Sequence, residues 1–289
     1  MRVPAEKNRR SVSDTLRRLF DVLYYIICSI APEYDRFMEK AEKYSEKKKK
    51  RINRLRPDRN AVRLLAAAAM TLNHAAAVFL PEGSFWWALL TYAGYLTAPV
   101  MCWFVVEGWH HTRDVRRYAG RLLTFALLAQ LPYMGALQLH NGNVLFTLLA
   151  CLLIVDVMHT EVRPERRMLL LLLLAGATAF CDWPCLLAGA AVLFARSRGS
   201  RAMQKQAWGL FLAVFALSVF SGNLEQYSVP AAIGHTLGAM CGPLAGAILV
   251  LYLYDADRPV RRTAFSRWFF YLYYPLHLAI LWALRAGLS

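Results

Sequence analysis

The sequence predicts an all-α protein that crosses a membrane several times, a polytopic transmembrane helical bundle. Of its 289 residues 57% are hydrophobic, yet the formal net charge is +15, a combination that is unusual in a soluble globular domain. Apolar segments recur that reach or approach the roughly 20 residues a helix needs to cross the hydrocarbon core. The loops between them differ in charge, as expected when the helix ends face different compartments.

Residues 1–60 are predicted to form a basic cytoplasmic extension. They carry 17 Lys or Arg residues against 9 Asp or Glu. The apolar run within Asp14–Ile30 is short for a span, and its flanking arginines favour an interfacial amphipathic helix. The next segment, Arg36–Arg56, has Glu–Lys pairs at helical spacing and ends in a basic block. We expect this arm to bind anionic lipid headgroups rather than nucleic acid, because no aromatic residues interleave the charges.

Residues 61–289 form the predicted transmembrane domain, with about nine spans. The fifth and sixth spans are short, and Cys181–Pro184 joins them as a tilted or re-entrant pair. The spans are expected at 62–80, 86–106, 117–138, 143–158, 168–180, 184–196, 205–221, 230–254 and 266–286.

The loops of this domain alternate in charge. One set, with the sequences PEGSF, QLHNGN, CDWP and SGNLEQYSVP, contains no Lys or Arg. The other set is basic. Because positive charge accumulates on the cytoplasmic side, the alternation places the N-terminus inside and supports the span count. The basic residues are Arg113, Arg116, Arg117, Arg163, Arg166, Arg167, Arg196, Arg198, Arg201, Lys205, Arg258, Arg261, Arg262 and Arg267.

A few polar residues interrupt the apolar spans. Ionisable side chains at membrane depth are costly and usually functional, although a histidine can also simply hydrogen-bond a neighbouring helix. The functional interpretation is favoured for His74 and His277, because each interrupts a long apolar run. Together they predict a deep, histidine-rich cluster that opens outward. The polar residues within or beside the predicted spans are Asn73, His74, Gln130, Asp182, His235 and His277.

A second polar cluster is predicted at the cytoplasmic ends of the second and third spans. The stretch Glu107–Leu123, EGWHHTRDVRRYAGRLL, brings a carboxylate, two histidines and several arginines together. It is either an orientation signal or the mouth of an anion-binding site. A metal site is not expected, because the adjacent His110 and His111 point about 100° apart on a helix and no zinc-enzyme spacing accompanies them.

Four stretches, taken in order, resemble the TraX family of bacterial membrane proteins, which is named for the conjugative-pilus protein that acetylates the N-terminus of F pilin. CDWP is a weaker fifth match, and the similarity covers about residues 62–285. The four are MTLNHAAAVFLP (Met70–Pro81), APVMCWFVVEGWHHTRDVRRYAGRLLTFALLAQLPY (Ala98–Tyr133), NVLFTLL (Asn143–Leu149) and WFFYLYYPLHLAIL (Trp268–Leu281).

The resemblance implies an acyltransferase of the bacterial inner membrane. Acetyl would pass from acetyl-coenzyme A to an acceptor on the outer side, the N-terminal amine of a pilin-like protein. A neutral histidine in an apolar site suits the base, so His74 is our first choice, with His277 as the alternative or as an orienting partner. Asn73 stands where the family usually has Asp, and Asp182 completes the predicted catalytic set.

The remaining site residues follow from the chemistry of a thioester donor. Arginines grip phosphates bidentately, so Arg113 and Arg121 are assigned to the phosphates of coenzyme A. Glu107 is expected to pair with one of them, and His110 lies beside them in the sequence. Hydrogen-bond donors must stabilise the oxyanion. The candidates for that role or for the acceptor side are Asn73, Gln130, Tyr133 and Asn143.

Two other functions remain open at this stage. One is an O-acyltransferase that modifies a cell-envelope glycan, which would change only the acceptor. The other is a non-enzymatic membrane scaffold or a small-solute transporter. A transporter should show repeated halves with helices broken at matching positions, and the sequence has no such symmetry beyond the short fifth and sixth spans and GAMCGPLAGA (Gly238–Ala247).

Overall fold

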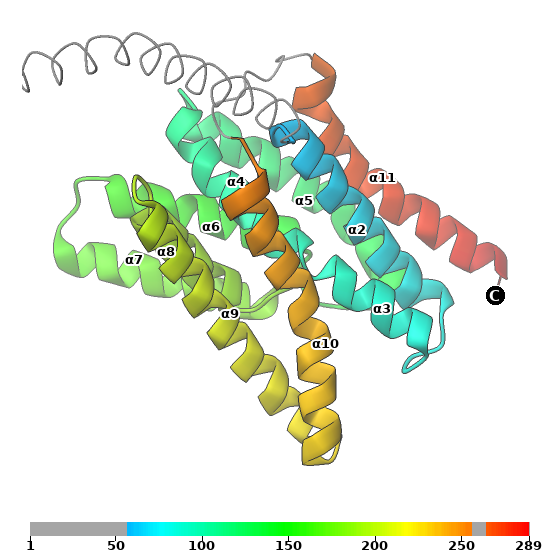
Figure 1. Cartoon of the computed structure of the whole chain (residues 1–289). Coiled ribbons are helices and arrows are strands. Elements are labelled where there is room, and N and C mark those ends of the chain that lie inside the picture. Colours follow the sequence, from blue (N-terminus) through cyan, green and yellow to red (C-terminus); the bar gives the residue numbers. More distant parts are fainter. Residues whose placement is uncertain (1–56, 256–263, 289) are drawn as a thin grey trace, which may run out of the picture. The chain divides into compact units, whose positions relative to one another are not determined.

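The computed structural model describes residues 57–255 and 264–288, and within these ranges the protein is helical without β-strands (Figure 1). The all-α prediction is therefore confirmed for this part of the chain. The interfacial helix and basic block predicted within residues 1–60 lie outside the described residues. The helices are α2 (Arg59–Phe79), α3 (Phe85–Gly94), α4 (Thr97–His111), α5 (Val115–Leu137), α6 (Val144–His159), α7 (Pro164–Ala177), η1 (Thr178–Phe180), α8 (Leu186–Arg196), α9 (Arg201–Leu224), α10 (Val229–Ile248), the π-helical η2 (Leu249–Leu253) and α11 (Ala264–Leu288).

The prediction of about nine membrane spans is not confirmed. Each expected segment contains a helix, but among the described residues four helical segments are both long and apolar enough to cross a membrane. One physical reason is length, because α6, α7 and α8 have 16, 14 and 11 residues and are short for a span. The helices α5 and α11 are long enough, with 23 and 25 residues, but are not among the four segments that are also sufficiently apolar. The four segments are Arg59–Phe79, Phe85–His111, Arg201–Leu224 and Val229–Leu253.

The short helix α8 is apolar because it belongs to the protein core. Its residues Leu187, Ala191 and Phe194 are fully or almost fully buried, and the helix packs against α6, α4 and α9. The indole of Trp208 on α9 lies 4.8 Å from the ring of Phe194 between centroids. A short apolar run of this kind is typical of a core helix, and hydropathy alone does not distinguish it from a lipid-facing one.

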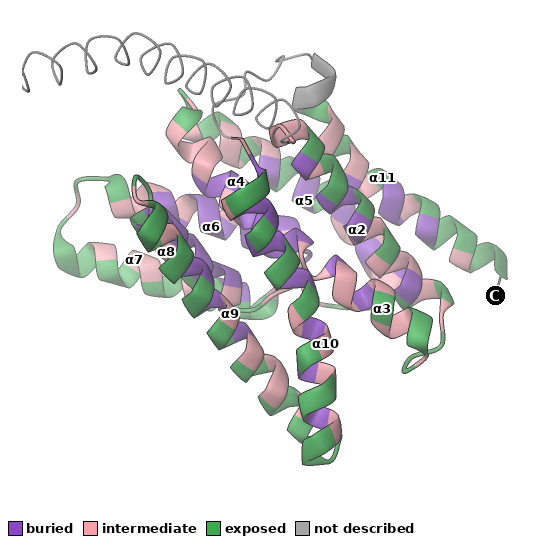
Figure 2. Cartoon of the chain, viewed as in Figure 1, coloured by how far each residue is buried: buried purple, intermediate pink, exposed green. Residues whose placement is uncertain are grey.

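The outer faces of several helices are exposed (Figure 2), and many of the exposed residues are large and apolar. A soluble monomer rarely exposes so many large apolar residues next to one another, whereas acyl chains solvate them at no cost. The distribution therefore suits a protein embedded in a bilayer. Examples are Leu127 and Leu131 on α5, Leu172 and Leu173 on α7, Leu217 on α9, Leu237 on α10 and Leu276 on α11.

Helix α10 approaches α3 and α4 so closely that glycine is required at the contact. A Cβ atom on Gly242 would overlap the carbonyl oxygen of Tyr92, and one on Gly238 would lie 2.7 Å from the Tyr92 ring. Small residues spaced four apart allow such close backbone approach between membrane helices. The contact holds the break between α3 and α4, at Tyr95 and Leu96, against α10.

The functional region lies where α2 crosses α11 and α5. Helix α11 packs along both α5 and α2, and α2 also packs on α3 and α4 (Figure 1). Gly135 on α5 makes room for Trp282, because a Cβ at that position would overlap the indole ring. This packing brings α2, which carries His74, and α11, which carries His277, side by side, although the two histidines are 203 residues apart in the sequence.

Candidate functional site

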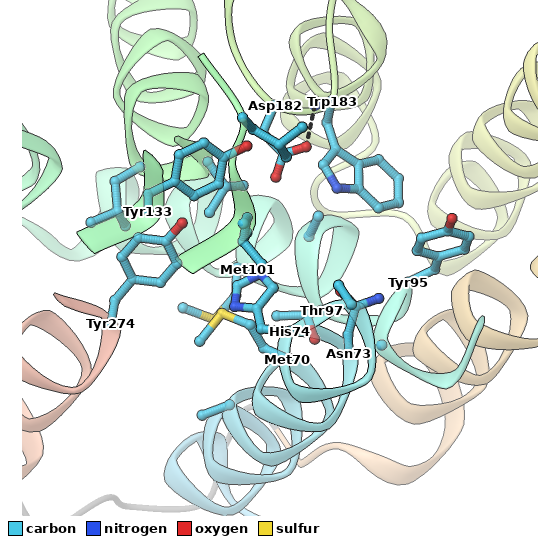
Figure 3. A pocket seen from close by; sticks show the side chains of 18 of the residues that line it. Met70, Asn73, His74, Tyr95, Thr97, Met101, Tyr133, Asp182, Trp183 and Tyr274 are labelled. Atoms are coloured by element: carbon cyan, nitrogen blue, oxygen red, sulfur yellow. Dashed lines mark hydrogen bonds between the residues drawn. The ribbon is translucent and has the colours of Figure 1, made fainter. Parts of the chain in front are cut away.

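A cavity of about 400 Å³ lies between α2, α4, α5, α6, α11 and the turn that precedes α8. Its wall is mostly apolar, with a few polar groups that point into one space (Figure 3). It extends along α2 from Ala67 to the loop residue Glu82. The polar and aromatic residues that line it are Asn73, His74, Glu82, Trp87, Tyr95, Thr97, Tyr133, Asp182, Trp183, Tyr273 and Tyr274.

Two histidines predicted to act together are in direct contact at this cavity. The Nδ1 atom of His74 lies 2.9 Å from Nε2 of His277, and the two rings stack with centroids 5.2 Å apart. The other nitrogen of His277, Nδ1, is 3.0 Å from the carbonyl oxygen of Tyr273. His277 is 6% exposed, so this geometry is held inside the protein.

These contacts determine which nitrogens carry protons when both rings are neutral. A carbonyl oxygen can only accept, so His277 must donate from Nδ1 to Tyr273. Its Nε2 is then unprotonated and accepts the Nδ1–H of His74. His74 is left with a lone pair on Nε2, on a ring that lines the cavity. The pair therefore presents a base to the cavity, with its tautomer set by the hydrogen bonds of the second histidine.

Asp182 reaches the cavity from a tight turn between η1 and α8. The turn is held against the start of α6, because Asp182 N donates to the Gly142 carbonyl at 2.7 Å and the Thr147 hydroxyl donates to the Asp182 carbonyl at 2.6 Å. Trp183 has a φ of 58°, which is uncommon for a bulky residue. Burial raises the pKa of the Asp182 carboxyl from its ordinary value to about 6.

The predicted oxyanion residues on α5 and α6 are hydrogen-bonded within the fold. Gln130 donates to the Asn141 carbonyl at 2.9 Å and accepts from the backbone and side chain of Asn143. Asn143 caps α6 through Leu145 N and donates to the Ala126 carbonyl. Neither Gln130 nor Asn143 is among the residues that line the cavity. Tyr133 does line it, and its hydroxyl donates to the Asn141 side chain at 3.2 Å.

Asn73 contacts a different element from His74. Its amide nitrogen donates to the Thr91 carbonyl at 2.9 Å, and its side chain fills the space left by Gly94, where a Cβ would overlap it. Asn73 therefore ties α2 to α3, while the partner of His74 is His277. The residue that precedes the histidine in the sequence does not hold its ring.

An arginine cluster lies near the first turns of α2, and we define it as Arg59, Arg63 and Arg121. Arg59 forms an ion pair with Glu107 at 2.8 Å, and the Tyr254 hydroxyl donates to the same carboxylate at 3.0 Å. The pairing of Glu107 with Arg113 or Arg121 was therefore wrong, because the fold brings the start of α2 to the end of α4. Arg121 lies over the rings of Tyr118 and Tyr271, at 5.6 and 5.8 Å from their centroids.

Arg63 connects this cluster to the cavity. Its guanidinium carbon lies 4.2 Å from the ring centroid of Phe270, and Phe270 lines the cavity. Its Nε atom is buried without a hydrogen-bond partner in the described part of the chain. Sequence reasoning missed Arg59 and Arg63 because basic residues at the start of a span are also topology signals. His74 follows Arg63 by eleven positions, close to three turns, and this spacing is the signal that could have placed both on one helix face.

Arg113 and His110, which were also predicted to bind the donor, lie away from the contact between Arg63 and Phe270. Arg113 is exposed in the turn between α4 and α5, where Asp114 caps α5 and pairs with Arg117. His110 packs edge-on against Trp109 and His159, with centroids 4.8 and 5.4 Å away. Among the residues predicted to bind the donor phosphates, Arg121 belongs to the arginine cluster, because it lies near Tyr118 together with Arg59 and Arg63.

The fold and the cavity define a helical membrane protein with a histidine pair, one ring buried and one half-buried, in a largely apolar site. The TraX protein family model matches residues 58–285, and the chain belongs to this family. It is 30% identical over 234 residues to the probable fimbrial assembly protein FimC, serogroup H1, of Dichelobacter nodosus, which covers 76% of this chain and 92% of that protein. No solved structure matches the chain.

Proposed function

We propose that the protein is an acetyl-coenzyme A-dependent acetyltransferase of the bacterial inner membrane, with its N-terminus in the cytoplasm. Its acceptor is the N-terminal amine of a pilin-like protein on the outer side. The observation that carries the proposal is the contact of His74 Nδ1 with His277 Nε2 at the wall of the cavity, which leaves Nε2 of His74 unprotonated when both rings are neutral. A neutral imidazole in an apolar site is suited to general-base catalysis near neutral pH.

The arginine cluster supports a donor that carries phosphates. The charge of Arg59 is matched by Glu107, whereas Arg63 retains a buried Nε without a partner among the described residues. Arg63 and His74 lie roughly 16 Å apart along α2, from 11 residues at about 1.5 Å each. A donor whose phosphates are separated from its thioester by an extended arm can contact both. Arginine binds phosphate in a fixed fork geometry.

The charge of the cavity supports an amine as the acceptor. Its described lining includes the acidic residues Glu82 and Asp182 but neither lysine nor arginine. Such a site attracts an ammonium group, and its aromatic walls add cation–π attraction. The family relative is a probable fimbrial assembly protein by name, which supports a protein acceptor over a glycan.

The proposal is tested with the full-length protein reconstituted in lipid vesicles and radiolabelled acetyl-coenzyme A. The acceptors are a synthetic peptide with a free N-terminus, the same peptide with a blocked N-terminus, and an oligosaccharide. We expect label only on the free-amine peptide. Label on the oligosaccharide alone would establish the O-acyltransferase instead. If the protein neither binds acetyl-coenzyme A nor transfers its acetyl group, a scaffold or transporter is supported instead.

A further inference from the structure

A buried hydrogen-bond donor in the cavity wall, the hydroxyl of Tyr274, has no part yet in the proposed reaction. The donors that the sequence suggested for the oxyanion already have acceptors. Asn73 donates to Thr91, and Tyr133 donates to Asn141. Gln130 and Asn143 are hydrogen-bonded within the fold and do not line the cavity.

Tyr274 differs from these residues in pairing. It is 3% exposed, it lines the cavity, and its O–H donates to no acceptor within the described residues, while the backbone N–H of Val144 approaches its oxygen. Buried polar groups in native proteins are nearly always paired, because an unpaired one loses its hydration without compensation. A retained O–H without an acceptor therefore requires a reason, and a ligand that supplies the acceptor is such a reason.

The position of Tyr274 relates it directly to the histidine pair. Its ring meets the His74 ring edge to face, with centroids 6.4 Å apart, and lies 5.5 Å from His277. The hydroxyl lies on the side of the cavity that also holds Tyr133 and Asp182 (Figure 3). It comes from α11, three residues before His277, so one helix carries both the residue that orients the base and the free donor.

We propose that Tyr274 is a catalytic residue that stabilises the oxyanion of acetyl transfer, an inference that rests on the proposed function. Once the acceptor ammonium has lost one proton to solvent, His74 Nε2 removes a second proton from the neutral amine as its nitrogen bonds to the carbonyl carbon of the thioester. The carbonyl π electrons move to oxygen, which accepts the hydrogen bond of the Tyr274 hydroxyl. When the intermediate collapses, the C–S bond breaks, and the leaving thiolate of coenzyme A takes the proton from His74.

Tyr274→Phe tests this role because it removes the hydroxyl and leaves the ring packing. Removing one oxyanion donor lowers kcat by roughly 100- to 1000-fold. Because the hydrogen bond forms only in the transition state, kcat and kcat/KM should fall by the same factor, with KM for acetyl-coenzyme A unchanged. The melting temperature should change little, since the O–H donates to no group in the described part of the folded protein.

The matched control is Tyr133→Phe, which removes a hydroxyl from the same cavity that is already paired. We expect it to lower the melting temperature and to reduce kcat by less than about 10-fold, since a typical hydrogen bond contributes about 0.5–1.5 kcal/mol. A Tyr274→Phe protein with wild-type kcat would overturn the oxyanion role and leave the proposed function standing. The oxyanion role would also be overturned if Tyr274→Phe lowered the melting temperature and raised KM for acetyl-coenzyme A in proportion. A wild-type protein that transfers no acetyl group would overturn the proposed function and this role together.

Discussion

The protein contains two groups of histidines that look alike in the sequence but differ in the structure. His111 and His159, at the ends of α4 and α6, each donate from Nδ1 to a carbonyl four residues earlier. His277 makes the same bond within α11, but its Nε2 also accepts a hydrogen bond from His74 on another helix. Only the second arrangement presents an unprotonated nitrogen to a cavity. What decides the role of a histidine here is the surroundings of its second nitrogen.

The two groups also differ in the aromatic residues that surround them. His159 lies 4.3 Å from Trp109, whose indole donates to Asp156 at 3.0 Å. That contact ties α4 to α6 at the ends of the helices. His74 and His277 instead stack on each other, and His277 also stacks on Tyr273, beside the cavity. We therefore expect substitutions in the first group to affect stability and those in the second to affect the reaction.

The largest effect is expected from replacing the base. His74→Gln should lower kcat for acetyl transfer by about 10²- to 10⁴-fold, the usual contribution of a general base, while binding of acetyl-coenzyme A persists. The matched variant is His159→Gln, which should change kcat by no more than a few-fold. Steady-state kinetics with labelled donor measure both. Equal losses in the two variants would remove the distinction between the histidine groups.

The next effect concerns the orientation of the base. His277→Leu removes the acceptor of the His74 Nδ1–H and should lower kcat by roughly 10- to 100-fold, as losses of an orienting partner do. His277→Gln retains an oxygen that can accept this hydrogen bond and should restore part of the activity. The ratio of kcat between these two variants is the measurement. Identical activity would mean that His277 contributes packing alone.

An analogous comparison applies to the arginines. Arg63→Gln should raise KM for acetyl-coenzyme A by roughly 10-fold or more, because a charge-assisted hydrogen bond contributes about 1.5–3 kcal/mol. Arg116→Gln, an exposed arginine after the α4–α5 turn, should leave KM unchanged. Donor binding measured by equilibrium dialysis checks the result without turnover. A larger loss of donor binding in Arg116→Gln than in Arg63→Gln would assign the donor site to the α4–α5 turn.

The smallest effect is a pH dependence of stability at Asp182. Burial raises the pKa of this carboxyl to about 6, above its value in the unfolded chain, so its stabilising contribution is present below about pH 4 and is lost as the pH rises through about 6. Asp182→Asn is uncharged throughout. The melting temperature of the wild type relative to this variant should fall between about pH 4 and 6 and then level off. A difference independent of pH would contradict the burial of the carboxylate.

Much of the candidate site follows from the sequence because few polar residues interrupt its apolar segments. His74 and His277 were selected for that reason, and the fold places them in contact. Tyr133 and Asp182 likewise reach the cavity. Each of these side chains is costly to bury without a partner or a function, so the sequence pattern already constrains their location.

Other assignments failed because sequence position does not specify a partner. Gln130 and Asn143 stood out as polar groups in apolar helices, but they hydrogen-bond the α5–α6 connection. Arg63 resembled one more topology signal until the fold placed it over Phe270. The predicted span count had the same weakness, since a core helix such as α8 is as apolar as a lipid-facing one.

The sequence by itself determined the helical class, the family and the histidines worth considering, because periodic apolarity and rare buried charges are local properties of the chain. The tertiary structure decided which of those groups act together. It paired His74 with His277 across 203 residues, matched Glu107 to Arg59, and left the Tyr274 O–H without an acceptor among the described residues. The reason is that a proton's location and a donor's availability depend on which atoms lie within hydrogen-bonding distance, and only the packing of helices settles that.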